Sequence, residues 1–168
     1  KKKKSILYIY MTGYHIDLTK ISIIFGLFVI ALSKNNTINL SILTLLIGVV
    51  VCGNLLCLFN SKEVSKYYNV SENILYIANL FSHFIIPIFI IYILHNNINY
   101  NQLELNHILI SLIINHFIIY SYFILMINKY TGHYGIKYRY VFVYGMIISL
   151  TILFSTYYLT NINNLKKN

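Results

Sequence analysis

Apolar residues along this chain gather into five long segments that are separated by short polar connections. Each segment is close to the roughly 20 residues that an α-helix needs to cross a bilayer. The segments are residues 16–32, 38–59, 74–94, 107–127 and 140–159. Backbone polar groups in lipid must be satisfied within a segment, and the alternation of a barrel strand is missing, so we expect helices. The pattern predicts an all-α, polytopic membrane helix bundle that forms one integral membrane domain over residues 1–168.

The first of these segments is the least regular. Asp17 and Lys20 lie in its opening turn, and residues 6–15 form a further apolar stretch before it. That stretch is either an interfacial segment or the remnant of another span upstream. We therefore expect five transmembrane helices, or six in the intact protein. The expected connections are residues 33–37, 60–73, 95–106 and 128–139.

The composition supports a bilayer as the solvent. The 168 residues are 58% hydrophobic and 10% charged, whereas a soluble domain carries about 25% charged residues. The net charge of +9 does not indicate nucleic acid, because the cations lie at span ends, where they meet anionic lipid headgroups. We expect membrane lipids as partners and a multi-pass location. Heavy use of residues with AT-rich codons suggests an AT-rich genome. The expected location is the plasma membrane of an AT-rich bacterium, or an endomembrane if the source is a eukaryote.

The distribution of Lys and Arg predicts an orientation. With five spans, ten of the 13 basic residues fall on one side of the membrane. The other three, Lys34, Lys166 and Lys167, fall on the opposite side. Because cytoplasmic loops carry the excess of basic residues, the N-terminus is expected inside and the C-terminus outside.

The sequence gives no indication of a metal or another cofactor. Cys52 and Cys57 lie at i, i+5 in one apolar span, which puts them on different helix faces. They are expected to be small apolar core residues rather than a disulfide or a zinc site. No Cys or carboxylate lies at the depth of the mid-span histidines, so a ligand set would be incomplete there.

His83 is the most informative candidate residue. It lies near the middle of residues 74–94, which include no charged residue, and an ionisable group in such a segment suggests function. Asn79, His83 and Pro87 share one helix face, and Ser82 is adjacent. Pro87 removes a helical hydrogen bond to the carbonyl of His83 and can kink the helix. The alternative is a histidine that holds the bundle together through a hydrogen bond across helices.

A second histidine, His116, follows Asn115 in the middle of residues 107–127. At 1.5 Å per residue, His83 is expected about 14 Å and His116 about 17 Å from the inner boundary. The shared depth allows a proton relay or a pair around one polar cavity. Alternatively, His116 hydrogen-bonds a neighbouring helix.

Polar residues at two span ends are further candidates. Thr19 and Ser22 open the first span, where hydroxyls serve as nucleophiles beside a base or as helix caps. If that helix begins at Ile16, Thr19 lies near the inner boundary, apart from His83. The two residues meet if the helix begins earlier, close to Ile6, or if a cavity lets it tilt inward. Lys137 and Arg139 end a loop rich in tyrosine and glycine. They are candidates for binding a headgroup or carboxylate, or for interfacial anchoring.

Three blocks in order resemble the androgen-induced membrane hydrolase family, whose members cleave fatty-acid esters of hydroxy fatty acids, and its bacterial relatives of unknown function. The blocks are GYHIDLTKIS at 13–22, NLFSHFIIP at 79–87, and YSY at 120–122 through YTGHYG at 130–135. The resemblance implies that Thr19 matches a nucleophilic threonine and His83 a catalytic histidine. The implied reaction is ester hydrolysis through an acyl-threonine, with Asn79, Ser82, His116, Lys137 and Arg139 as candidate substrate-binding residues.

Two other functional classes compete with this hydrolase. One is a non-enzymatic membrane protein for structure, assembly or transport, in which mid-membrane histidines and asparagines hold the helices together. The other is a proton-coupled carrier that uses His83 and His116. The carrier lacks an acidic residue inside the membrane, because the four acidic residues lie at span ends or in loops.

Overall fold

A computed structural model describes residues 18–127 and 138–165 of the chain. All the long elements in these two ranges are helices, which confirms the all-α bundle. They are α2 (Leu18–Leu32), α3 (Asn36–Tyr68), α4 (Glu72–Leu80), the π-helix η1 (Phe81–Ile85), α5 (Ile86–Asn97), the short 3₁₀ turn η2 (Tyr100–Gln102), α6 (Leu105–Ile127) and α7 (Tyr138–Leu165).

Four of the five predicted spans correspond to helices that are long and apolar enough to cross a membrane. These are α3, the continuous α4–η1–α5 unit, α6 and α7. The described part of the first span, α2, has 15 residues. At 1.5 Å per residue α2 is about 22 Å long, which is short of the roughly 30 Å of a bilayer core.

All four predicted connections overlap a helix, since α3 begins at Asn36 and α7 at Tyr138, and the overlap is largest for residues 60–73 and 95–106. Residues 60–73 were expected to form a polar loop, but α3 continues to Tyr68 and has one non-helical residue, Asn60 (φ −129°, ψ 26°). The helix ends at Asn69, whose left-handed backbone (φ 55°) and N–H bonds back to α3 form a C-cap. In the same way, α5 extends to Asn97 and η2 occupies part of residues 95–106. Polar residues thus continue helices beyond the apolar segments that defined the spans.

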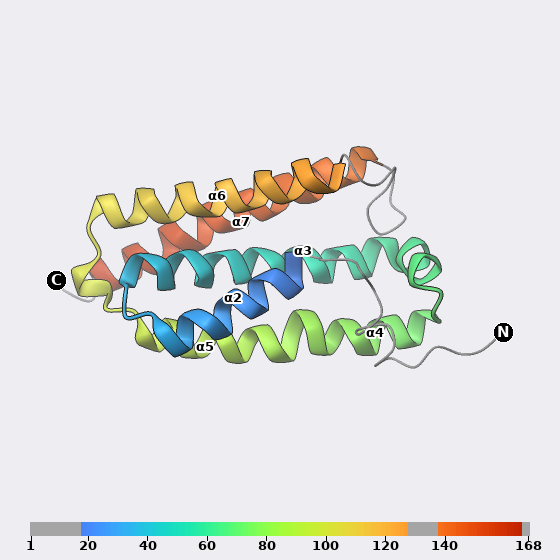
Figure 1. The fold of residues 1–168 in the computed structure, drawn as a ribbon, viewed down its shortest axis with the longest axis horizontal. Helices are drawn as coiled ribbons and strands as arrows, with labels where there is room; N and C mark the ends of the chain where they lie inside the picture. Colours follow the sequence, from blue (N-terminus) through green and yellow to red (C-terminus); the bar gives the residue numbers. More distant parts are fainter. Residues whose placement is uncertain (1–17, 128–137, 166–168) are drawn as a thin grey trace.

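The helix α3 lies at the centre of the bundle. It packs against α6 and α7 on one side and against α2, α4 and α5 on the other (Figure 1). More than half of its most apolar window is buried (56%), compared with about a fifth of α6 and α7 (22% each). The outer helices therefore expose large apolar side chains such as Phe89, Phe117 and Phe154, as expected for a bundle surrounded by lipid.

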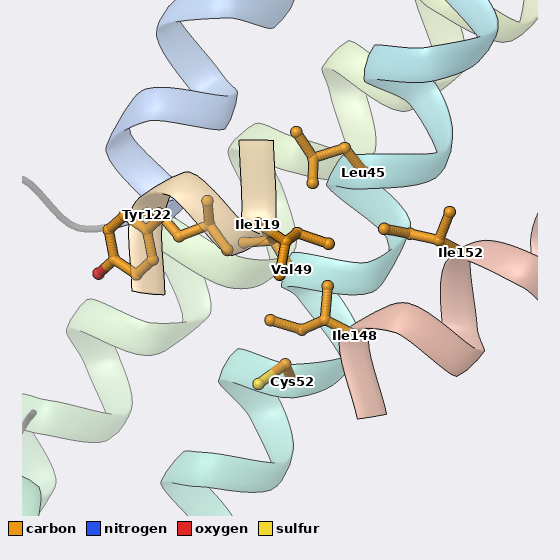
Figure 2. Packing of buried hydrophobic residues seen from close by; sticks show 8 residues of the cluster. Leu45, Val49, Cys52, Ile119, Tyr122, Ile148 and Ile152 are labelled. Carbon is orange, nitrogen blue, oxygen red and sulfur yellow. The ribbon is translucent and has the colours of Figure 1, made fainter. Parts of the chain in front are cut away.

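An apolar cluster joins α3 to α6 and α7 in the middle of the bundle. Figure 2 shows Leu45, Val49 and Cys52 of α3 against residues of the other two helices. The partners are Ile119 and Tyr122 of α6 and Ile148 and Ile152 of α7, and Leu18 of α2 completes the cluster. Both cysteines are buried and free, in line with their expected role as small core residues.

Candidate functional site

Thr19 and His83 meet on the opposite side of α3 from α6. The Thr19 hydroxyl Oγ1 lies 2.7 Å from His83 Nε2, a hydrogen bond between α2 and η1 that spans 64 residues of sequence. Thr19 is buried, with 6% of its surface exposed, and His83 is half-buried. The two residues that the family resemblance paired are therefore in direct contact.

The sequence leaves the relative depth of Thr19 and His83 open, and the structure decides it. The ends of α2 and α5 and the start of α3 lie at one end of the bundle (Figure 1). Thr19 lies 13 residues before the end of α2 at Leu32, and His83 lies 14 residues before the end of α5 at Asn97. At 1.5 Å per residue both lie about 20 Å from that end. The described start of α2 is level with the middle of the bundle, so both side chains share one depth.

The π-helix that carries His83 follows from the proline four residues later. Pro87 has no N–H, so the α-helical bond to the His83 carbonyl cannot form. Ile86 N–H instead bonds to Phe81 O, five residues back. Asn54 of α3 donates its Nδ2 to the freed His83 carbonyl (3.3 Å). Such π-bulges occur frequently at functional sites.

Two residues of α3 that the sequence reasoning missed fix the position of this segment. Asn54 Nδ2 also donates to Val50 O (2.8 Å), and its Oδ1 accepts from Asn79 Nδ2 (3.0 Å). Asn79, expected to bind substrate, is thus bonded to α3. Gly53 faces the imidazole, because a Cβ built there would lie 2.0 Å from His83 Cδ2. The signal in the sequence is the small–polar pair Gly53-Asn54 inside an apolar span, a combination typical of helix contacts in membranes.

Ser82, another expected substrate-binding residue, contacts the other nitrogen of the imidazole. Its hydroxyl donates to Ala78 O (2.9 Å) and lies 2.9 Å from His83 Nδ1. A serine hydroxyl has one proton. In the tautomer with the proton on Nδ1, His83 donates to Ser82 Oγ while that hydroxyl donates to Ala78 O. In this tautomer Nε2 is the acceptor for the hydroxyl proton of Thr19.

The remaining candidates do not join this cluster. His116 lies on α6, whereas η1 packs on the other side of α3. His116 Nδ1 lies 2.8 Å from Leu112 O of its own helix, and its ring lies beside Tyr120. Its neighbour Asn115 is the residue that faces α3. Arg139 is in the first turn of α7, and Lys137 lies outside the described residues.

The site can offer a hydroxyl beside an imidazole at the edge of an apolar surface. Phe81 and Phe84, on either side of Ser82 and His83, expose 49% and 48% of their surfaces. Within the described ranges, no three His, Cys, Asp or Glu side chains gather in a metal-binding group. In this arrangement the imidazole is within hydrogen-bond reach of the hydroxyl.

The architecture is that of an all-α bundle, and residues 18–127 and 138–165 include four helices suited to crossing a membrane. Comparison with family models, curated proteins and solved structures finds no match for this chain. The resemblance to the androgen-induced hydrolase family therefore stays a prediction, and so do the roles that it implies for Thr19 and His83.

Proposed function

We propose that this protein is a membrane-embedded hydrolase of lipid esters in which Thr19 is the nucleophile and His83 the general base. The observation that carries the proposal is the 2.7 Å contact between Thr19 Oγ1 and His83 Nε2. This distance lies within the range in which a base can accept the proton of a nucleophile. The Ser82 hydroxyl supports it further, since it leaves Nε2 as the acceptor.

The proposed reaction has two steps. In the first, Thr19 Oγ1 attacks the ester carbonyl carbon while its proton passes to His83 Nε2. The tetrahedral intermediate collapses, the alcohol leaves with the proton from His83, and an acyl-threonine remains. In the second, water attacks the acyl carbon and gives a proton to His83. Thr19 leaves with that proton, so that one ester and one water become one acid and one alcohol.

The surroundings of the pair favour a substrate that approaches from lipid. Thr19 itself is buried, whereas Phe81 and Phe84 beside His83 are about half exposed on the apolar surface of the bundle. Acyl chains in the bilayer can reach such a surface without crossing water. Esters of fatty acids therefore fit the site better than soluble esters. We place the protein in the bacterial plasma membrane, or in an endomembrane if the source is eukaryotic.

The test measures hydrolysis of a fatty-acid ester of a hydroxy fatty acid by the purified protein in lipid nanodiscs. Thr19→Ala and His83→Ala are each expected to lower turnover by at least about 100-fold, the usual contribution of general acid–base catalysis. Ser22→Ala is the matched control, because Ser22 is also a buried hydroxyl on α2 but donates to Leu18 O of its own helix (2.7 Å). Unchanged turnover in both Thr19→Ala and His83→Ala would contradict the proposal.

A non-enzymatic role is the second candidate, and the bonds around His83 favour it specifically. Asn54 and Asn79 join α3 to the helix of His83, and Thr19 joins α2 to it. If these bonds only hold helices together, His83→Ala lowers the thermal stability and the wild-type protein shows no ester hydrolysis. If the protein is an enzyme, the wild type hydrolyses the ester. The His83→Ala variant then loses hydrolysis while its thermal stability stays close to that of the wild type.

A further inference from the structure

A second polar region lies on the other side of α3, where three helices meet. Its side chains are Ser41 and Thr44 of α3, Ser111 and Asn115 of α6, and Thr156 of α7. All five are at most 2% exposed. Within helices α3, α6 and α7 at this level no residue is charged. A layer of neutral hydroxyl and amide groups is thus buried in an apolar bundle.

Three members of this layer form a bonded chain across two helices. Ser41 Oγ donates to Asn115 Oδ1 (2.6 Å), and Asn115 Nδ2 donates to Thr44 Oγ1 (2.8 Å). Thr44 in turn donates to Leu40 O (2.9 Å). These two bonds fix the orientation of the Asn115 amide group, in which Oδ1 accepts from Ser41 and one N–H of Nδ2 donates to Thr44. One N–H of that amide is left to donate elsewhere.

The other two members have no hydrogen-bond partner among the described residues. These are Ser111 Oγ and Thr156 Oγ1. Ser111 is one helical turn before Asn115, on the same face of α6. Asn39 is similarly unpartnered, but its spacing from Ser41 puts it on the opposite face of α3.

The packing of α7 places Thr156 at the level of Thr44. A Cβ at Gly48 would lie 3.3 Å from Ile152 Cγ1, so these two residues are in register. The helices α3 and α7 run in opposite directions (Figure 1). One turn after Ile152 on α7 is Thr156, and one turn before Gly48 on α3 is Thr44. Thr156 is therefore level with Thr44, and Ser111 lies one helical turn, about 6 Å, from Asn115 along α6.

We propose that this layer binds a small cluster of water molecules between α3, α6 and α7. A buried hydroxyl without a partner costs free energy, and internal water commonly supplies the missing partners when several polar groups surround it. Water can both accept from Ser111, Thr156 and the free N–H of Asn115 and donate to their oxygens. A cation does not fit this layer, because the amide group of Asn115 presents a hydrogen-bond donor here and a cation accepts no hydrogen bond.

The hydrated layer is separate from the proposed hydrolase site. Thr44 lies eight residues into α3, about 12 Å from the start of that helix at 1.5 Å per residue. Gly53 lies nine residues beyond Thr44 on the same helix, about 14 Å further along, and Val49 of the apolar cluster lies between them. The water cluster is thus a structural and solvent-binding feature, and its test does not depend on activity.

The direction in which one substitution shifts the melting temperature tests the proposal. Thr156→Val keeps the shape of the side chain and removes the hydroxyl. If water bridges that hydroxyl, the melting temperature falls by about 2–4 °C, the shift expected when one satisfied hydrogen bond is lost. If the hydroxyl is a dry, unpartnered group, the melting temperature stays the same or rises, and the proposal is wrong. Thr151→Val is the matched control, because Thr151 on the same helix donates to Ile147 O (2.8 Å).

Coupling between the two hydroxyls gives a second test. Ser111→Ala and Thr156→Val are combined, and the melting temperatures of the singles and the double are compared. Residues without a direct contact that share water show a non-additive effect, whereas independent residues show additive shifts. Additive shifts would contradict a shared cluster. A rise in melting temperature in sodium chloride that choline chloride does not reproduce would assign a cation instead and would also overturn the proposal.

Discussion

The two polar regions on either side of α3 belong to the same apolar bundle but differ in chemistry. On one side, Thr19 and His83 combine a hydroxyl with a titratable ring in a segment where the helix widens into a π-turn. On the other, Ser41, Thr44 and Asn115 are neutral groups on regular helices. Both regions satisfy polar groups across helices. Burial and hydrogen bonding alone therefore do not decide whether the Thr19–His83 region is the reactive site that we propose or a structural contact.

The difference lies in how each region is held. The neutral layer is almost fully buried, with Asn115 at 0% exposure, and its members bond mainly to each other. The imidazole is half-buried beside exposed aromatic residues, and its position depends on Gly53, Asn54 and Pro87 around it. A site for chemistry needs both a held base and an approach for the substrate, and only the first region shows both among the described residues.

The largest effect that separates the two regions is expected from Gly53→Ala. The new Cβ would lie 2.0 Å from a ring atom of His83, so the imidazole or the helix must move. We expect a loss of about 3 kcal/mol in the free energy of unfolding together with loss of ester hydrolysis, measured by denaturation and by turnover in nanodiscs.

Gly48→Ala is the control on the opposite face of α3. Its Cβ would contact Ile148 and Ile152 of α7 at 3.1–3.3 Å, and it does not touch His83. This variant is expected to lose less stability and to keep its turnover. Equal loss of turnover in both variants would show that general packing, rather than the position of the imidazole, controls activity.

An intermediate effect is expected from Asn115→Ala in the neutral layer. The change removes two hydrogen bonds between α3 and α6 and leaves a cavity at a fully buried position. We expect the free energy of unfolding to fall by about 2 kcal/mol, while turnover per folded molecule stays unchanged. His116→Ala, one residue further along α6, is the comparison and should cost less, because His116 bonds only within its own helix in the described structure. Loss of turnover in Asn115→Ala would mean that the two regions are coupled through α3.

The smallest effect is expected from Ser82→Ala. Without the acceptor at Nδ1, the imidazole loses its preference for the ring form in which Nε2 accepts from Thr19. The ¹⁵N resonances of His83 should show a larger share of the other form, and turnover should fall about tenfold, which corresponds to about 1.4 kcal/mol in the barrier. Ser82→Thr retains the hydroxyl and should restore both readouts. Unchanged resonances in Ser82→Ala would leave Ser82 without a role in orienting the ring.

Much of the fold could be predicted from the sequence. The apolar segments that defined the second to fifth spans lie within α3, α4–α5, α6 and α7, because hydrophobic length and the lack of charges are local properties. The ends of the helices were less predictable. Residues 60–68 are polar enough to resemble a loop, but they continue α3 to an Asn69 cap, and packing rather than hydrophobicity decides where such a helix ends.

The candidate site was predictable only in part. Ser82, His83 and Pro87 could be selected from one segment, since a mid-span histidine and a proline are local signals. Gly53 and Asn54 were missed, because a glycine or an asparagine in an apolar helix indicates a contact without naming the partner. The family resemblance paired Thr19 with His83, while depth along the helices favoured His116.

Local patterns of hydrophobicity are enough to predict that the chain forms apolar helices and that one of them presents a histidine beside a proline. Which residue meets that histidine depends on how the helices pack. Thr19 reaches His83 because the described start of α2 lies level with the middle of the bundle, a matter of how helices are staggered. Asn115 rather than His116 faces α3 because neighbouring residues on a helix point about 100° apart. Stagger and rotation depend on contacts between distant segments, and no local pattern specifies them.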